Sequence, residues 1–416
     1  MKEKKVHLKI TNVLLVASAA VLLFGGGYKL GEGKFILQQG ISGISAPVQK
    51  KNINFDMFWK VWDTLEKKYV DQKKLDSKKM YYGAIKGMVA SIEDPYTFFL
   101  TPTENKQSKD DLGGRFEGIG AQLGLKDNRV VVIAPLKDSP AEKAGMRAGD
   151  YIVKVDSLVT AGLPLTQVVS KVRGDKGTKV HITLERSGKE IVVDVIRDAI
   201  HIESVETRLN EKLSTCDVDC DMVAYLKLNQ FGDSTVDEWE QKVIDIKKEW
   251  DNGKIKGLVL DLRDNPGGYL ESSVYLAGEF LPQGKLVVKQ ESTTYENKDY
   301  FVTRGGSLLT IPLTVLINKG SASAAEILSG ALRDNKRAAL VGEKSFGKGS
   351  VQEALDLGDG MGLHVTVAKW VLPKGEWING KGITPETVIE NVIPEGNTMS
   401  RELDKQLDTA IEKLIK

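Results

Sequence analysis

Asn318-Lys-Gly-Ser-Ala-Ser-Ala-Ala-Glu-Ile327 and Gly342-Glu-Lys-Ser-Phe-Gly-Lys-Gly-Ser-Val-Gln352 are the two segments that say most about this 416-residue chain. The mostly apolar run 313–317 comes directly before the first segment and predicts a buried strand. Small residues then turn the chain, and a helical pattern begins near Ala324. The sequence here therefore predicts a strand, a tight turn and a helix, in that order.

The first segment also has the features of a nucleophile site. A serine at a strand-to-helix turn can point its hydroxyl into a cleft, and the new helix offers free backbone N–H groups to an oxyanion. Ser323 stands where the turn becomes the helix, so we expect it to be the nucleophile. Ser321, two residues earlier, is the alternative.

A serine hydroxyl needs a base, and the second segment offers a lysine. The four histidines of the chain lie elsewhere: His7, His181, His201 and His364. Lys348, between two glycines, is the better candidate. With a pKa near ~10.4, about one free lysine in ~2500 is neutral at pH 7, a deficit of roughly 4.6 kcal/mol. Burial can lower a lysine pKa by ~3–5 units, which removes most of that deficit.

Gln352 follows Lys348 by four residues, a spacing that can place both side chains on one face of a strand. If residues 348–357 form a strand, then Lys348, Ser350 and Gln352 share one face, because side chains alternate along a strand. A neutral amide at that position could orient the lysine amine without restoring its charge. An aspartate there would instead tend to keep the lysine protonated.

Taken alone, small residues at the start of a helix are more often a matter of packing than of catalysis. The motifs Gly-Ser-Ala-Ser-Ala-Ala-Glu-Ile and Gly-Lys-Gly-Ser-Val-Gln together, however, resemble the carboxyl-terminal processing peptidases, also called tail-specific proteases. In that family a serine–lysine pair, assisted by a glutamine, cleaves peptide bonds. The resemblance implies these roles for Ser323, Lys348 and Gln352, and it covers most of residues 54–390.

Composition narrows the functions open to the chain. The 58 basic and 57 acidic residues leave a net charge of +1, so no basic field favours nucleic acid as a partner. The apolar content of 41% is ordinary for a globular protein, and the length suggests two or three domains. Residues 342–348 have the glycine spacing of a phosphate loop, but Gly349 stands where Ser or Thr is required.

The N-terminus predicts a connection to a membrane. Four lysines flank the start of an apolar run from Ile10 to Tyr28, a pattern of secretory signals and uncleaved signal anchors. Residues 17–19 resemble a cleavage site, but apolar residues continue past them. We expect residues 1–30 to be a signal anchor and residues 31–53 a linker. The bulk of the chain would then lie outside the cytoplasm, in the bacterial cell envelope, and cleavage would make it secreted or periplasmic.

The two cysteines, Cys216 and Cys220, favour a local disulfide if the chain lies outside the cytoplasm. A metal site would need further ligands, and the neighbouring aspartates are hard oxygen donors, unlike thiolates. Two free thiols in a loop are the remaining alternative. We expect no metal, nucleotide or organic cofactor.

Residues 54–112 predict an N-terminal helical segment. Large apolar residues recur at helical spacing from Phe58 to Tyr69, and a second helical run follows Asp76. Two helices this short cannot enclose a large core alone. We therefore expect the aromatic stripe to be core that packs on another domain, with no role in the chemistry.

Residues 113–199 resemble a PDZ domain in the order of their strands and helices. The resemblance implies that Gly118, Ile119 and Gly120 form the loop that presents backbone N–H groups to a peptide C-terminal carboxylate, while the peptide adds as a strand. In related proteases an arginine of the PDZ domain helps to signal occupancy to the active site. Arg173 is our candidate for this regulatory role, and a surface charge at a helix C-terminus is the alternative.

Strands and helices alternate through residues 200–395, which predicts an α/β core. The resemblance implies a crotonase-like fold for this peptidase core. It also implies that the Gly-Gly pair after the buried strand 257–262 lies beside the nucleophile, where glycine lets the backbone approach a substrate closely. We carry over Gly268, with Gly267 as its neighbour, as an oxyanion-hole donor that is joined by the N–H of Ala324.

Two further features of this region are expected to be structural. Asp334 matches an acidic position sometimes discussed for the family, and we interpret it as structural. Residues 396–416 predict an amphipathic helix whose apolar stripe packs against the core or against a partner subunit in a homo-oligomer.

The sequence thus predicts a membrane-anchored serine endopeptidase that recognises protein C-termini through a PDZ domain. A non-catalytic PDZ adaptor on a protease-like core is the second hypothesis, and the intact Ser323, Lys348 and Gln352 count against it. A crotonase-like acyl enzyme is the third, and the PDZ domain and the Ser/Lys pair disfavour it.

Overall fold

The computed structural model describes most of the chain outside its N-terminus: residues 53–126, 129–136, 138–147, 149–163, 165–201, 203–391 and 400–415. By its internal contacts the chain divides into two units, residues 1–77 and residues 78–416. The expected signal anchor and nearly all of the expected linker lie outside the described residues. Within the described ranges, no helix is both long enough and apolar enough to cross a membrane.

The described part of the first unit is helical, as predicted. It holds α2 (Asp56–Lys68) and the short 3-10 helix η1 (Gln72–Lys74). None of the residues of α2 is buried, and its aromatic side chains are open to solvent, with Trp59 56% exposed. No other described part of this unit covers the stripe, and its packing on another domain stays a prediction. Helical spacing shows that one face is apolar, but it does not show what covers that face.

The second unit begins with the segment that leads to the PDZ-like region. Helix α3 (Ser77–Ala90) crosses the boundary between the units, and β1 (Phe98–Leu100) and α4 (Pro102–Leu112) follow it. Thr101 caps α4, because its backbone N–H donates to Glu104 Oε2 over 2.9 Å and its hydroxyl accepts from the Glu104 N–H. The cap fixes the point at which the chain leaves β1.

The PDZ-like region has its own sheet and its own core. Its elements are β2 (Arg115–Gly118), β3 (Ala121–Lys126), β4 (Arg129–Pro135), α5 (Pro140–Lys143), β5 (Tyr151–Val155), β6 (Leu158–Val159), α6 (Leu165–Val172), β7 (Lys179–Arg186), β8 (Lys189–Ile196) and β9 (Asp198–His201). The strand order is β3-β4-β5-β7-β8, so β3 is an edge strand. Ser187 and Gly188 have positive φ in the hairpin between β7 and β8, as expected for a tight turn.

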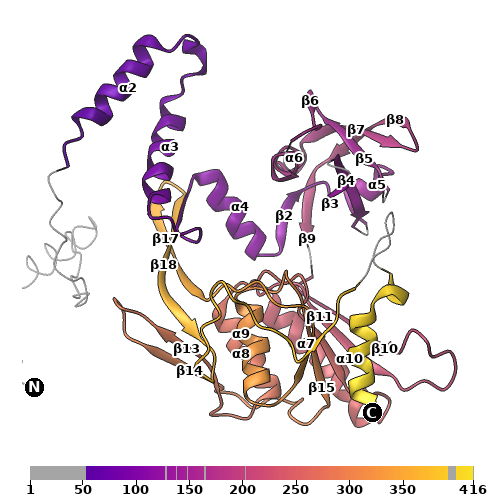
Figure 1. The fold of residues 1–416 in the computed structure, drawn as a ribbon. Helices are drawn as coiled ribbons and strands as arrows, with labels where there is room; N and C mark the ends of the chain where they lie inside the picture. The colour runs from indigo at the N-terminus through magenta and orange to yellow at the C-terminus, as the bar shows by residue number, and fades with distance from the viewer. Residues whose placement is uncertain are drawn as a thin grey trace, which may run out of the picture. The chain divides into compact units, whose positions relative to one another are not determined.

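The peptidase region is an α/β layer structure, which confirms the predicted fold class (Figure 1). Its main sheet has the order β10-β11-β12-β15-β16-β19, with parallel pairing from β11 onward. The strands are β10 (Val205–Glu211), β11 (Val223–Leu228), β12 (Leu258–Asp261), β15 (Leu313–Ile317), β16 (Ala339–Gly342) and β19 (Thr387–Val388). Almost every side chain of β11, β12 and β15 is buried, as expected for parallel strands covered on both faces.

Helices cover the two faces of this sheet. The side chains of α7 (Thr235–Asp251), α8 (Leu270–Phe280) and α9 (Ala324–Asp334) share one apolar core with the sheet. The last helix, α10 (Lys405–Ile415), buries Leu407, Ala410 and Ile411 against the opposite face. Of the two partners proposed for this helix, it therefore uses the core.

A second sheet joins distant parts of the chain. Its strands are β1, β13 (Leu286–Glu291), β14 (Lys298–Phe301), β17 (Ser350–Gly358) and β18 (Met361–Val371). Strand β18 pairs with β17 and also with β1, where Phe98 lies opposite His364. The residues just after α3 are therefore held beside the strand pair that carries Gln352. The 3-10 helix η2 (Arg401–Leu403) precedes α10.

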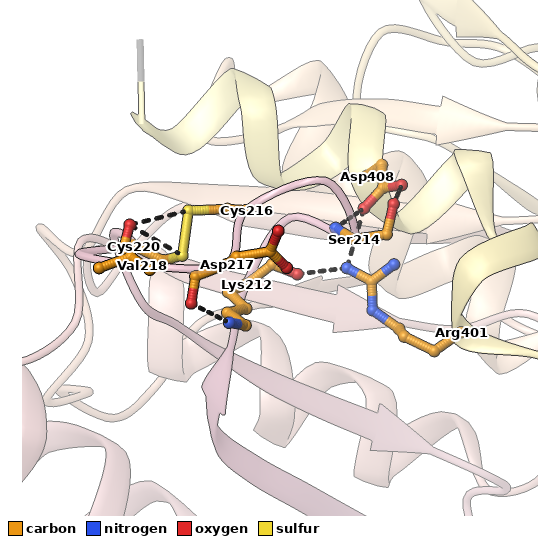
Figure 2. Close-up of a disulfide and its surroundings, with 8 residues drawn as sticks. All are labelled: Lys212, Ser214, Cys216, Asp217, Val218, Cys220, Arg401 and Asp408. Carbon is orange, nitrogen blue, oxygen red and sulfur yellow. Dashed lines mark hydrogen bonds and ion pairs between the residues drawn. A yellow bond between two sulfur atoms is a disulfide. The ribbon is translucent and has the colours of Figure 1, made fainter.

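Cys216 and Cys220 form a disulfide, as predicted, in the loop between β10 and β11 (Figure 2). The same loop is tied to α10, because the Ser214 N–H donates to Asp408 Oδ1 over 2.9 Å. Arg401 forms an ion pair with Asp408 at 2.9 Å and so joins the same cluster. The disulfide therefore closes a loop that helps to seat the C-terminal helix.

Candidate active site

The turn between β15 and α9 gives its two serines different environments. Ser321 is fully buried, and its hydroxyl donates to the Leu262 carbonyl over 2.8 Å and accepts from the Asn318 N–H over 2.9 Å. Ser323 lines a cavity and has φ of 53°, a left-handed conformation that a serine adopts only when its surroundings enforce it. Ser321 is occupied in holding the turn, while Ser323 faces open space.

Glu326, on the first turn of α9, ties this turn to the lysine segment. It accepts the Ser323 N–H through Oε2 over 2.9 Å, and it also accepts the N–H groups of Gly347 over 2.7 Å and Lys348 over 2.9 Å. The carboxyl is fully buried, and burial raises the pKa of Glu326 although these hydrogen bonds and one from Ser345 oppose it. One side chain thus sets the backbone of both catalytic candidates.

Ser323, Lys348, Gln352 and Gly268 all line one cavity of about 630 Å³. The rest of its wall is largely apolar and aromatic, and includes Leu270, Ile327, Val351, Trp370 and Tyr300. The structure therefore brings the predicted nucleophile, base, orienting amide and oxyanion donor to one place.

Lys348 is half-buried, and protein groups lie close to its amine. Its Nζ donates to Gln352 Oε1, and the ring of Tyr96 lies 5.3 Å away on another side. Burial lowers the pKa of Lys348, while the carboxylates of Glu326 and Asp94 act in the opposite direction. The Ser323 hydroxyl and this amine line the same cavity, and no hydrogen bond joins them within the described ranges.

The amide nitrogen of Gln352 fixes the orientation of its side chain. Its Nε2 donates to Ser350 Oγ over 2.9 Å and to Thr366 Oγ1 over 3.1 Å, which leaves Oε1 for the lysine. Strand β17 begins at Ser350 rather than at Lys348, and its pairing with β18 shifts register between Val351 and Gln352. The predicted extent of the strand is wrong by two residues. Side-chain hydrogen bonds, rather than simple alternation, bring the lysine and the glutamine together.

The glycine pair lies directly beside the nucleophile. A Cβ atom on Gly267 would fall 2.7 Å from the Cβ of Ser323, so no larger residue fits there. The Gly267 N–H already donates to Asn265 Oδ1 over 2.8 Å. The N–H groups of Gly268 and Ala324 have no acceptor among the residues that the structure describes. Gly268 and Ala324, not Gly267, therefore have N–H groups to offer an oxyanion.

The residues assigned to peptide binding lie between β2 and the edge strand β3. Ile119 is buried, and Gly120 has φ of 71° with Ser139 packed so closely that a Cβ would lie 2.5 Å from its Cβ. Gly118 ends β2. The loop is thus shaped by glycine and leads directly into a strand whose outer edge is unpaired in this sheet.

The two remaining candidates have ion-pair partners. Arg173 donates from Nη1 to Asp111 Oδ1 of α4 over 2.8 Å, and its guanidinium lies 5.0 Å from the Phe116 ring. Asp334 pairs with Arg333 at 2.8 Å and accepts the Lys374 N–H over 3.1 Å. The contacts of Asp334 are those of a structural residue, as interpreted from the sequence.

Sequence reasoning missed several residues around the lysine. The sequence pattern gives Asp94, Tyr96, Thr366 and Glu326 no role in the chemistry. Glu326 lies inside the serine motif, so its spacing was visible in the sequence. The other three come from segments distant in the chain, and no local pattern marks them.

Family models match three parts of the chain. Residues 222–389 match peptidase family S41, residues 131–186 match a PDZ domain, and residues 20–103 match the N-terminal domain of the activating protease CtpB. The order of the three matches is the order of the three regions predicted from the sequence.

Named relatives cover most of the chain. The carboxy-terminal processing protease CtpB of Bacillus subtilis is 34% identical over 385 residues, which span 91% of this chain and 78% of that protein. A CtpA-like serine protease of Staphylococcus epidermidis is 38% identical over 360 residues, which span 84% of this chain and 70% of the relative.

Solved structures are similar in fold as well. The photosystem II D1 C-terminal processing protease has a TM-score of 0.51 and 30% identity, and the match covers 80% of this chain and 92% of that one. An S41 protease from Bacteroides fragilis has a TM-score of 0.52 and 18% identity, and the match covers 84% and 95% of the two chains.

Proposed function

Because the chain belongs to peptidase family S41 and is a serine peptidase of the carboxy-terminal processing type, we propose that Ser323, Lys348 and Gln352 are its catalytic residues. The single observation that supports this most strongly is the shared cavity, which both Lys348 and Ser323 line. The peptidase region would be crotonase-like, as the sequence resemblance implies.

The proposed reaction follows from the groups that line this cavity. Neutral Lys348 takes the proton of Ser323 as the Oγ attacks the carbonyl carbon of the scissile bond. The N–H groups of Gly268 and Ala324 stabilise the oxyanion that forms. The protonated lysine then gives its proton to the leaving amine, and an acyl-enzyme remains. A water molecule, deprotonated by the lysine, hydrolyses that ester and regenerates the serine.

Gln352 has a positioning role in this scheme. Its Nε2 is engaged by Ser350 and Thr366, so its Oε1 must face the lysine. A carbonyl oxygen can accept from the amine in either protonation state, and it adds no negative charge that would favour the ammonium form. The amide thus directs the lysine without opposing its deprotonation.

Substrates would be selected by their C-terminal tails. An extended peptide could pair with the free edge of β3, and its terminal carboxylate would then lie at the loop of Gly118, Ile119 and Gly120. The location implied by the N-terminal sequence, a membrane anchor with the peptidase outside the cytoplasm, completes the proposal. Assembly into a homo-oligomer is a further part of it that remains to be measured.

Two other functions are less well supported. A non-catalytic PDZ adaptor would not need a buried lysine, whose burial carries a cost in stability. A crotonase-like acyl enzyme would need to bind an acyl thioester, and a PDZ-like region gives no reason for that. The test below separates all three.

The test uses the full chain with an unstructured protein as substrate. The native protein should cleave it and should react covalently at Ser323 with a fluorophosphonate. Ser323→Ala and Lys348→Ala should lose both activities, and Ser91→Ala, at an exposed serine on the N-terminal segment, should keep them. Mass spectrometry of peptides retained by Ser323→Ala should identify tails with a free C-terminus. Full activity of Ser323→Ala would contradict the proposal.

A further inference from the structure

The segment between α3 and β1 reaches the candidate active site from outside the peptidase region. It contains Asp94-Pro-Tyr-Thr97, and β1 follows it directly and pairs with β18. The match to peptidase family S41 begins only at residue 222. A part of the chain that no peptidase motif includes is therefore placed next to Lys348.

Asp94 organises this turn and fastens it to the peptidase sheet. Its carboxylate accepts the Tyr96 N–H over 3.0 Å and the Thr97 hydroxyl over 2.7 Å. The Thr97 Oγ1 in turn accepts the N–H of Thr366 over 3.0 Å, and Thr366 is the residue that holds Gln352. One chain of hydrogen bonds thus runs from the turn to the amide that orients the lysine.

Tyr96 places its ring against the lysine amine. The Lys348 Nζ lies 5.3 Å from the ring centroid. Tyr96 also lines a second cavity, of about 970 Å³, which shares Ser350 and Val367 with the cavity that holds Ser323. Tyr96 therefore borders both this larger cavity and the amine. We expect its removal to open the amine to water from the larger cavity.

The charged and titratable groups around the amine come from four elements. Asp94 and Tyr96 belong to the turn, Glu326 to α9, His364 to β18 and Glu353 to β17. The carboxylates of Glu326 and Asp94 favour the ammonium form. Burial, followed by the charge of Lys348, lowers the pKa of His364. The lysine can be neutral near physiological pH only if exclusion of water outweighs the two carboxylates.

We propose that Tyr96, fixed by the Asp94 turn, is a positioning residue that shields the Lys348 amine from water and so sets the pH range in which the lysine acts as a base. This inference rests on the proposed role of Lys348. It gives the N-terminal segment a direct part in the chemistry, because the wall of the lysine site is completed by residues that precede the PDZ-like region.

The Tyr96 ring has two opposing effects on the pKa of Lys348. The larger of them decides whether the ring raises or lowers that pKa. A ring face attracts a cation and so favours the ammonium form. The ring also excludes water, and desolvation lowers a lysine pKa. We infer that the exclusion of water is the larger effect, because burial lowers the pKa of Lys348 although two carboxylates oppose it. Opening this side to water should raise the pKa of Lys348.

The experiment follows the rate of fluorophosphonate reaction at Ser323 against pH in the full chain. The rate of the native protein should rise with pH to a plateau as Lys348 loses its proton. Tyr96→Ala should move the midpoint upward by about one pH unit, so that the rate below the midpoint falls about tenfold while the plateau remains. Tyr96→Gln, which keeps much of the volume but brings a polar group to the amine, should shift it in the same direction.

Tyr96→Phe keeps the ring and should keep the native midpoint. Tyr81→Ala is the matched control, because Tyr81 lies on α3, is 49% exposed and packs on Tyr82 rather than on Lys348. A midpoint that stays in place or moves downward in both Tyr96→Ala and Tyr96→Gln would overturn the proposal, and so would an equal loss at every pH. If Lys348→Ala reacts at the native rate, the proposed function fails instead, which keeps the two failures apart.

Discussion

At the scale of single residues, the site depends on two serines of one turn, Ser321 and Ser323, which have different environments. Ser321 uses its hydroxyl twice, toward Leu262 and Asn318, and is fully buried. Ser323 takes the left-handed backbone conformation that projects its side chain into the cavity. The sequence favours Ser323 from its place at the helix start, but it could not show why the neighbour is unsuitable.

The different environments of Ser321 and Ser323 predict opposite outcomes when each is replaced by alanine. Ser323→Ala should abolish peptide cleavage, a loss of about 10⁴-fold or more, while the melting temperature stays close to native. Ser321→Ala should keep cleavage but lower the free energy of unfolding by about 1–3 kcal/mol, since it leaves two buried partners unpaired. Cleavage assays and denaturant titrations of the two variants check this. Loss of cleavage in stable Ser321→Ala would make Ser321 the nucleophile.

Local sequence patterns identify only some of the residues that surround Lys348. Spacing along the chain brought Lys348 and Gln352 together, because only three residues separate them. It could not identify Tyr96 or Thr366, which arrive through pairing of β1 and β17 with β18. The resemblance favoured Gly268 over Gly267 as the oxyanion donor, and the hydrogen bond from Gly267 to Asn265 gives a physical reason for that preference.

At the scale of elements, the buried strands and their following helices were predictable. β15 has the predicted bounds, and α9 begins at the predicted Ala324, because a continuous apolar run between turn residues has few other interpretations. β17 was less predictable, since two glycines and a register shift interrupt its start. For α2 the helical spacing indicated an apolar face, and what covers that face stays a prediction.

The disulfide between Cys216 and Cys220 is expected to stabilise the loop that seats α10 without affecting catalysis (Figure 2). Chain-entropy estimates for so short a loop give about 2 kcal/mol, which should appear as a melting temperature lower by roughly 2–4 °C. Replacing both cysteines with serine should give this shift, and kcat/KM should remain native. Thermal unfolding with and without a reductant checks it. A large loss of activity at unchanged stability would show a different role.

At the scale of the whole second unit, α4 connects the PDZ-like region with the site. Arg173 contacts Asp111 near the end of this helix, and the carbonyl of the next residue, Leu112, accepts the Asp233 N–H over 3.1 Å. Asp233 accepts the hydroxyl of Tyr269 over 2.9 Å, and both Leu112 and Tyr269 line the cavity of Ser323. These contacts form a physical route by which occupancy of the PDZ-like region could influence the site.

If Arg173 transmits occupancy, its removal should affect only substrates that the PDZ-like region recognises. Arg173→Ala should lower kcat/KM about tenfold for a peptide with a free C-terminal carboxylate, a coupling of about 1–3 kcal/mol. The same peptide with an amidated C-terminus should be cleaved at the native rate. Lys171→Ala, at an exposed residue near the end of α6, is the control. An equal loss for both peptides would show that Arg173 acts only on stability or chemistry.

The proposed mechanism depends on a lysine that gives up its proton far more readily than a lysine in water. Burial, opposed by Glu326 and Asp94, lowers the pKa of Lys348, so the base form should appear at lower pH than it does in a lysine in water. The most direct measurement is an NMR titration of the ¹³C-labelled Lys348 side chain in the full chain, assigned by comparison with Lys348→Met. We predict that this one resonance titrates well below the other lysines. A resonance that titrates together with them would contradict the assignment of Lys348 as the base.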